Sequence, residues 1–262
     1  EGSGDPPAAN ALPAIDETAR VAATMRVFIG NSFMWISSLN FPDKRLTAML
    51  AMSLAALLTL TGIAQPVFPE LRSRAEAIAA LEQPDPRQRA AGVIYIARTG
   101  LPPDGPLLVR RLSDESPVVR ELAEAGAWQV WTRSGDTETD KLLAAGSQQM
   151  SAGQLQPAIA TFGRVIRRQP AFAEGWNKRA TAYFLAGDFQ KSLADCAEVI
   201  KRNPQHFGAL SGYGQIYFQL EDFDKSLEYF RRALAVNPNM SGVEINIRAI
   251  EELLRDKRRK MI

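Results

Sequence analysis

The sequence predicts an all-α fold in which helix pairs stack into an α-solenoid. Its second half repeats with a period of 34 residues, and a repeat of this size is typical of one helix pair. Residues 70–135 also follow a helical periodicity, with Pro86 and Pro117 where helices would begin. We therefore expect a helical module over 65–136 and a repeat domain over 137–262. The repeat domain would contain units 139–172, 173–206 and 207–240 and a capping helix at 241–260.

The 34-residue period rests on positions that keep their chemical character. A proline recurs near the end of each unit, small residues recur at two positions, and bulkier residues recur at others. Small residues allow paired helices to approach closely, and the bulkier ones fill the space between turns. The registers are Pro170/Pro204/Pro238, Gly146/Ala180/Gly214, Ala158/Ser192/Ser226, Phe162/Cys196/Phe230 and Gln149/Tyr183/Tyr217.

The second unit resembles the tetratricopeptide repeat (TPR) family. The residues at its signature positions are Trp176, Ala180, Tyr183, Gly187, Ser192 and Pro204. The resemblance covers about 139–240 and implies a right-handed α-solenoid of three TPR helix pairs, with Trp176 packed in the core. Leu142 and Leu210 replace the tryptophan in the other units, and Cys196 replaces an aromatic residue. The second unit is also similar to bacterial exported TPR proteins.

The module before the repeats shows a second, shorter internal similarity. Stretches that begin at Asp85 and Ser116 resemble each other at an offset of 31 residues. The arrangement Asp114-x-x-Pro117-x-Val119-Arg120 resembles HEAT-like repeats. Trp128 and Trp131 lie on one face of a predicted helix. We expect them to pack this module onto the repeats, whereas the alternative is an exposed ligand-stacking site.

Composition disfavours most enzyme chemistry. The net charge is only +2, so nothing in the charge balance points to nucleic acid. The chain has a single cysteine, Cys196, and a single histidine, His206, too few for a zinc or di-iron cluster. No nucleophile elbow, phosphate-binding loop or metalloprotease motif is present. We expect no catalysis, cofactor, metal or small-molecule substrate, a buried Cys196, and a solvated His206.

The N-terminal region predicts export. Residues 1–45 are interpreted as a disordered N-terminal leader region, and Lys44-Arg45 precede an uncharged run over 46–64. Its apolar core has the length of a signal-peptide hydrophobic region, followed by Gly62 and Ala64 as in a cleavage site. The run is also near bilayer-spanning length, so a membrane tether is an alternative, and a buried core helix is a third. The remainder is expected to be periplasmic or exported, with anchoring in the inner membrane as the alternative to a cleaved signal.

The TPR resemblance implies a partner-binding groove lined by the first helix of each unit. Met150, Phe184 and Phe218 recur at 34-residue spacing. They are interpreted either as a partly exposed apolar stripe or as packing between repeats. The predicted groove residues are Met150, Asn177, Lys178, Thr181, Phe184, Ser211, Gln215, Phe218 and Gln219. The expected function is a scaffold that binds a protein or peptide partner in the cell envelope. The alternative is an accessory subunit of an envelope enzyme complex for the cell wall or export.

The chain ends in a cluster of cations, Arg255-Asp-Lys-Arg-Arg-Lys260. Cations suit the C-terminal end of a helix because they interact favourably with its dipole. Contact with anionic lipid headgroups or with an acidic partner is the alternative.

Overall fold

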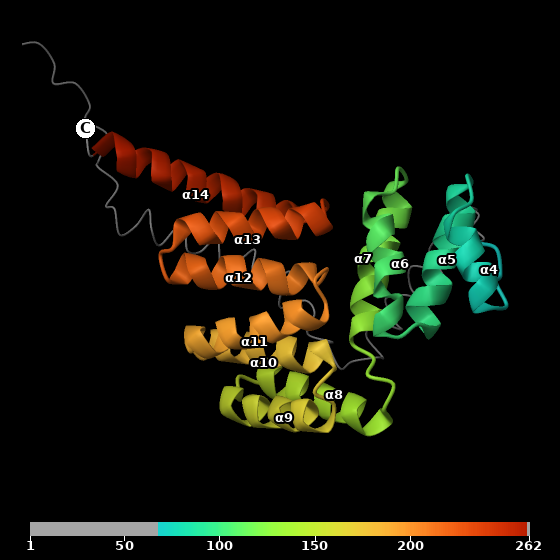
Figure 1. Cartoon of the computed structure of the whole chain (residues 1–262), viewed down its shortest axis with the longest axis horizontal. Coiled ribbons are helices and arrows are strands. Elements are labelled where there is room, and N and C mark those ends of the chain that lie inside the picture. The colour runs from blue at the N-terminus through green and yellow to red at the C-terminus, as the bar shows by residue number, and fades with distance from the viewer. Residues whose placement is uncertain (1–67, 261–262) are drawn as a thin grey trace, which may run out of the picture.

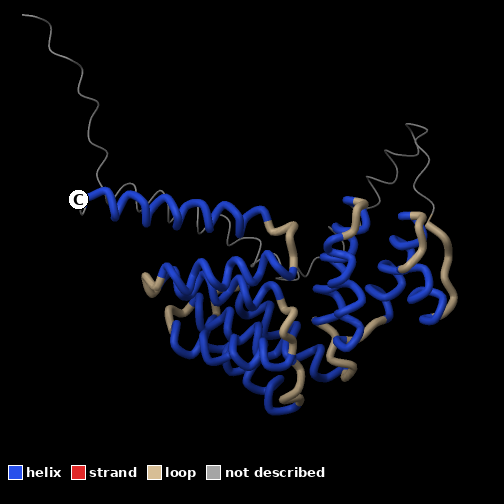
Figure 2. The backbone as a smooth tube through the Cα atoms, turned by 45° about the horizontal axis from the view of Figure 1, so that its top comes forward, coloured by secondary structure: helices blue, strands red, loops and turns tan. Residues whose placement is uncertain are grey.

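The computed structural model describes residues 68–260, so the predictions for 1–45 and 46–64 lie outside it. All regular secondary structure in the described part is helical (Figures 1 and 2), which confirms the predicted all-α fold. The elements are α4 (Arg74–Leu81), α5 (Pro86–Thr99), η1 (Pro102–Asp104), α6 (Gly105–Val109), η2 (Arg110–Ser113), α7 (Pro117–Trp131), α8 (Thr137–Ser151), α9 (Leu155–Arg168), α10 (Ala173–Leu185), α11 (Phe189–Arg202), α12 (Phe207–Gln219), α13 (Phe223–Val236) and α14 (Ser241–Lys260).

The second half is a solenoid of three helix pairs, α8/α9, α10/α11 and α12/α13, with α14 packed on α13 at its end (Figure 1). The tight turn inside each pair uses the same position. Gly153 and Gly187 have φ values of 73° and 77° there, and Glu221 has 58°. Glycine adopts this left-handed region freely, whereas a side chain disfavours it. In the third turn, Glu221 therefore adopts a backbone conformation that glycine provides in the first two turns.

Glycines in the first helices make room for phenylalanines in the second helices. A Cβ at Gly146 would lie 2.5 Å from the Phe162 ring, and a Cβ at Gly214 would lie 2.5 Å from the Phe230 ring. Both rings are fully buried. The close approach of paired helices therefore requires the missing side chain at these two positions.

The second pair uses the opposite combination of sizes. Ala180 stands where the other repeats have glycine, and the smaller Cys196 stands where they have phenylalanine. Both are fully buried in one cluster, which confirms the prediction for Cys196. The methyl group of Ala180 thus takes part of the space that a ring occupies in the other repeats. Burial raises the pKa of the Cys196 thiol far above its usual value, so it stays protonated and unreactive.

Trp176 does not lie in the core, contrary to the prediction. It is half-buried, its indole N–H donates to the Pro170 carbonyl oxygen at 3.0 Å, and two guanidinium groups lie near its ring. The carbon of the Arg202 guanidinium is 4.7 Å from the ring centroid and that of Arg179 is 5.2 Å away. The ring therefore packs under cationic side chains at the surface.

The N-terminal module consists of α4 and α5 followed by α6 and α7. Pro86 and Pro117 are the first residues of α5 and α7, as predicted. The segment 101–106 after α5 contains η1 and the start of α6. The HEAT-like interpretation of this module stays a prediction.

The module and the repeat array share one hydrophobic cluster. It joins residues of α4–α7 to residues of α12, α13 and α14. Trp131 and Trp128 form the junction: their rings lie 4.5 and 5.4 Å from the His206 ring, and each lies 5.1 Å from the Phe207 ring. The two tryptophans thus pack the module onto the repeats, which confirms that prediction.

Candidate protein-binding surface

Most of the predicted groove residues are buried within the chain. They lie on α8, α10 and α12, the first helices of the three repeats. Phe184 and Gln219 keep intermediate exposure. The buried residues are Met150, Asn177, Lys178, Thr181, Ser211, Gln215 and Phe218.

The predicted apolar stripe is not an exposed surface. Met150 belongs to the buried core of the first repeat. The rings of Phe184 and Phe189 lie 5.7 Å apart, and the rings of Phe218 and Phe223 lie at the same separation. Each pair joins the end of a first helix to the start of the second helix of the same repeat. The prediction of a partly exposed stripe is therefore wrong for Met150 and Phe218. Met150 is buried in the core of the first repeat, and Phe218 is buried in the cluster that joins the N-terminal module to the array.

Asn177 and Lys178 belong to a buried polar network centred on Glu174. The Glu174 carboxylate lies 3.5 Å from the Lys178 ammonium and 3.0 Å from the Asn177 side-chain nitrogen. His206 Nε2 lies 3.2 Å from the same carboxylate. Burial disfavours the charged form, but these three neighbours outweigh it and hold the pKa of Glu174 below its usual value. Two predicted groove residues thus stabilise a buried charge.

The prediction of a solvated His206 is wrong, since its ring is fully buried. Its Nδ1 accepts a hydrogen bond from the Ala209 backbone N–H at 3.1 Å and so caps α12. Because Nδ1 is an acceptor, we assign the proton of the neutral ring to Nε2, which donates to Glu174. Trp131 closes the site by stacking on the ring at an interplanar angle of 22°. The histidine is therefore a structural element of the junction.

The groove residues that remain accessible lie at the C-terminal ends of α10 and α12. Leu185, the last residue of α10, is 39% exposed, and Leu220, the C-cap of α12, is 38% exposed. For brevity we call Phe184, Leu185, Gln219 and Leu220 together the docking edge, after the role proposed for them below. Leu185 stands one repeat before Gln219, at the equivalent position. The repeat register could have indicated Leu185, but the exposure of both leucines required the structure.

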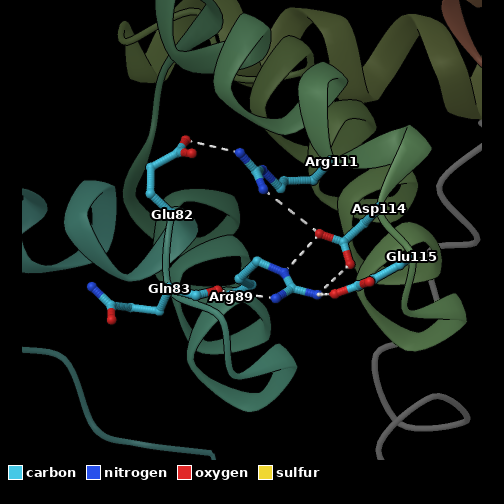
Figure 3. Close-up of a pocket in the computed structure, with 6 residues that line it drawn as sticks. All are labelled: Glu82, Gln83, Arg89, Arg111, Asp114 and Glu115. Atoms are coloured by element: carbon cyan, nitrogen blue, oxygen red, sulfur yellow. Dashed lines mark hydrogen bonds and ion pairs between the residues drawn. The ribbon is translucent and has the colours of Figure 1, made fainter.

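A cleft of about 330 Å³ lies in the N-terminal module (Figure 3). Arg89 at its centre donates from Nε and Nη2 to the two Asp114 oxygens, both at 2.8 Å. Its remaining hydrogen bonds reach Glu115 at 3.1 Å and the backbone oxygens of Gln83 and Pro84 at 3.0 and 2.6 Å. All five guanidinium donors thus have partners within the chain. The cleft is therefore a structural ion-pair lock between two turns.

Arg111 completes the ion-pair lock at the opposite side of the cleft (Figure 3). It donates to Glu82 at 2.8 Å and lies 3.7 Å from Asp114. Burial by itself raises the pKa of Asp114. The opposing effect is larger, because Asp114 accepts hydrogen bonds from Arg89 and the Ser116 backbone N–H and lies near the positive charges of Arg89 and Arg111. The pKa of Asp114 is therefore lowered overall. The lock therefore contains an ionised carboxylate at neutral pH.

The described residues also limit other kinds of site. No group of three or more histidine, cysteine, aspartate or glutamate side chains there is arranged to hold a metal ion. None of the helices between residues 68 and 260 is long and apolar enough to cross a bilayer.

Two family models, both described as tetratricopeptide repeat, match the chain over residues 143–206 and 209–240. No curated protein matches it significantly in sequence. Residues 143–206 and 209–240 are therefore similar to tetratricopeptide repeats, as the sequence resemblance implied.

Among solved structures, similar chains are also TPR domains. The first TPR of Spaghetti (RPAP3), bound to the HSP90 peptide SRMEEVD, is 23% identical with a TM-score of 0.44, and the match covers 46% of this chain and 96% of that chain. The first TPR domain of human RPAP3 is 23% identical with a TM-score of 0.44, covering 46% and 95%. The Sgt2 TPR domain from Aspergillus fumigatus is 21% identical with a TM-score of 0.45, covering 47% and 83%.

Proposed function

We propose that this chain is a non-catalytic scaffold that binds a peptide or helix of a partner protein at the docking edge of its TPR array. The observation that carries the proposal is the exposure of Leu185 and Leu220 at the same end of successive first helices. Apolar side chains on a rigid array provide anchors for a partner. The single cysteine and the single histidine of the chain are both fully buried, which further supports a binding rather than a catalytic role.

The docking edge is tested with Leu185→Glu combined with Leu220→Glu. We expect partner capture from a native envelope extract to fall about 10-fold or more, because interface anchors often contribute at least 2 kcal/mol. The matched control is Leu101→Glu with Val118→Glu, which puts the same charges at two exposed apolar positions of the N-terminal module. The control should capture the partner at wild-type strength, and circular dichroism should show both variants folded.

Two outcomes would contradict the docking edge. Equal capture by the wild type and the docking-edge variant would place the partner elsewhere. Equal losses in both variants would mean that capture depends on exposed apolar area in general. A catalytic protein recovered in stoichiometric amount would instead indicate an accessory subunit of an enzyme complex.

We also propose that residues 65–262 function outside the cytoplasm, in the cell envelope. The support is the basic pair Lys44-Arg45 followed by the uncharged run over 46–64. A reporter that is active only after export, fused behind Gly135, is expected to be active. A stable but inactive fusion would contradict export. Mass spectrometry of the mature N-terminus distinguishes cleavage near Ala64 from a retained membrane tether.

A further inference from the structure

The C-terminal end of α14 extends away from the packed body of the array. Ile250 is fully buried, Leu253 and Leu254 are partly buried, and residues 255–259 are exposed. The end of this helix projects past α13 in both views (Figures 1 and 2). A flat surface can therefore reach it without colliding with the rest of the array.

This projecting end concentrates positive charge, and we call Arg255, Lys257, Arg258, Arg259 and Lys260 the basic tip. Residues 255–260 contain these five cations and one carboxylate, whereas the whole chain has a net charge of only +2. The remainder of the chain is therefore net negative. The contact between Arg259 and Asp256 is long, at 4.0 Å, and both side chains are largely exposed, so it neutralises little of the charge.

Two features favour a lipid surface over nucleic acid as the partner of the basic tip. The segment 255–260 has no aromatic side chain on which a base could stack. Lys257 lies over the Phe223 ring at 4.7 Å, and the carboxylates of Glu221, Asp222 and Asp224 stand beside that phenylalanine in the sequence. These carboxylates would repel the phosphates of a nucleic acid that followed the surface of the array. A planar membrane would contact mainly the projecting end, away from these carboxylates.

We infer that the basic tip is a membrane-surface contact that binds anionic lipid headgroups. Clustered lysines and arginines are attracted to anionic bilayers, and each contributes roughly a fivefold gain in affinity near the surface. The attraction acts between exposed charges and is therefore screened by salt. The inference rests on the geometry and charge of α14 and is independent of the docking edge.

The test is co-sedimentation of the full chain with vesicles of phosphatidylcholine alone or of phosphatidylcholine with phosphatidylglycerol. Binding to the neutral vesicles measures any contribution of the uncharged run over 46–64, and the gain on adding anionic lipid measures the contribution of charge. We expect Lys257→Ala/Arg258→Ala/Arg259→Ala to reduce that gain on the order of 100-fold. The helix should persist, because alanine is the best helix former.

The matched control is Arg87→Ala/Arg98→Ala/Arg110→Ala, which removes three exposed cations from the N-terminal module. It changes the net charge equally and is expected to leave the gain unchanged. The inference is overturned if the wild type gains nothing from anionic lipid, or if both triple variants lose binding equally. Binding to duplex DNA as tight as to anionic vesicles at the same salt, lost in the α14 variant, would assign the cluster to nucleic acid instead.

Discussion

Replacing Asp114 with alanine is expected to lower the free energy of unfolding by about 3–5 kcal/mol, the range for breaking a buried ion pair by removing one partner. The side chains of Arg89 and Asp114 are only 6% and 3% exposed, and Asp114 accepts two of the five hydrogen bonds from the guanidinium. Without the carboxylate, a permanently charged group stays buried without adequate compensation. Chemical denaturation of the wild type and the variant measures the difference.

Glu115→Ala is the control for this experiment. Its carboxylate contacts the same guanidinium at 3.1 Å but is 84% exposed, so its loss should cost about 0.2–1 kcal/mol. Equal costs for the two substitutions would contradict the ion-pair lock.

The cost of Asp114→Ala should also depend on pH. The pKa of Asp114 is lowered on folding, so its stabilisation is complete above the unfolded-state pKa and is lost as the pH falls through the folded-state pKa. The difference between wild type and variant should therefore shrink in acid.

The array could be predicted from the sequence because its determinants are local and repeated. The helix turns, the small positions and the apolar registers recur every 34 residues, and each specifies a contact within one repeat or with its neighbour. The sequence interpretation of Cys196 was incomplete. Its replacement of an aromatic residue was recognised, but not that the larger Ala180 packs in the same cluster where the other repeats have glycine.

The candidate binding surface could not be predicted to the same extent. A residue's place in the repeat indicates the helix face on which it lies, but not what covers that face. Phe218 is buried partly because Phe223 lies five residues later, across a turn. His206 stands beside Pro204 in a polar turn, and its burial depends on Trp131 in a helix of the other module. The contact between His206 and Trp131 joins two modules, so it leaves no signal in a single repeat.

Trp131→Ala is expected to lower the free energy of unfolding by about 3–5 kcal/mol, the range for deleting a buried large aromatic side chain. Trp131 is 3% exposed and stacks on His206. Its indole also fills the space above Gly105, where an added Cβ would lie 2.5 Å from Nε1. The cavity would open at the junction between the module and the array. Hydrogen exchange should therefore accelerate in α7 and at the start of α12.

Trp176→Ala is the comparison that decides whether this cost comes from the junction or from any lost tryptophan. Trp176 is half-buried, and its ring contacts Arg179 and Arg202 at the surface. Cation–π contacts at exposed sites contribute about 0.5–1 kcal/mol each, so we expect a total cost of about 1–2 kcal/mol and no change in exchange within α7. Costs in the reverse order would mean that the TPR signature position, and not the junction, is the more stabilising site. The ranking thus tests the packing of the module directly, because both substitutions remove the same side chain.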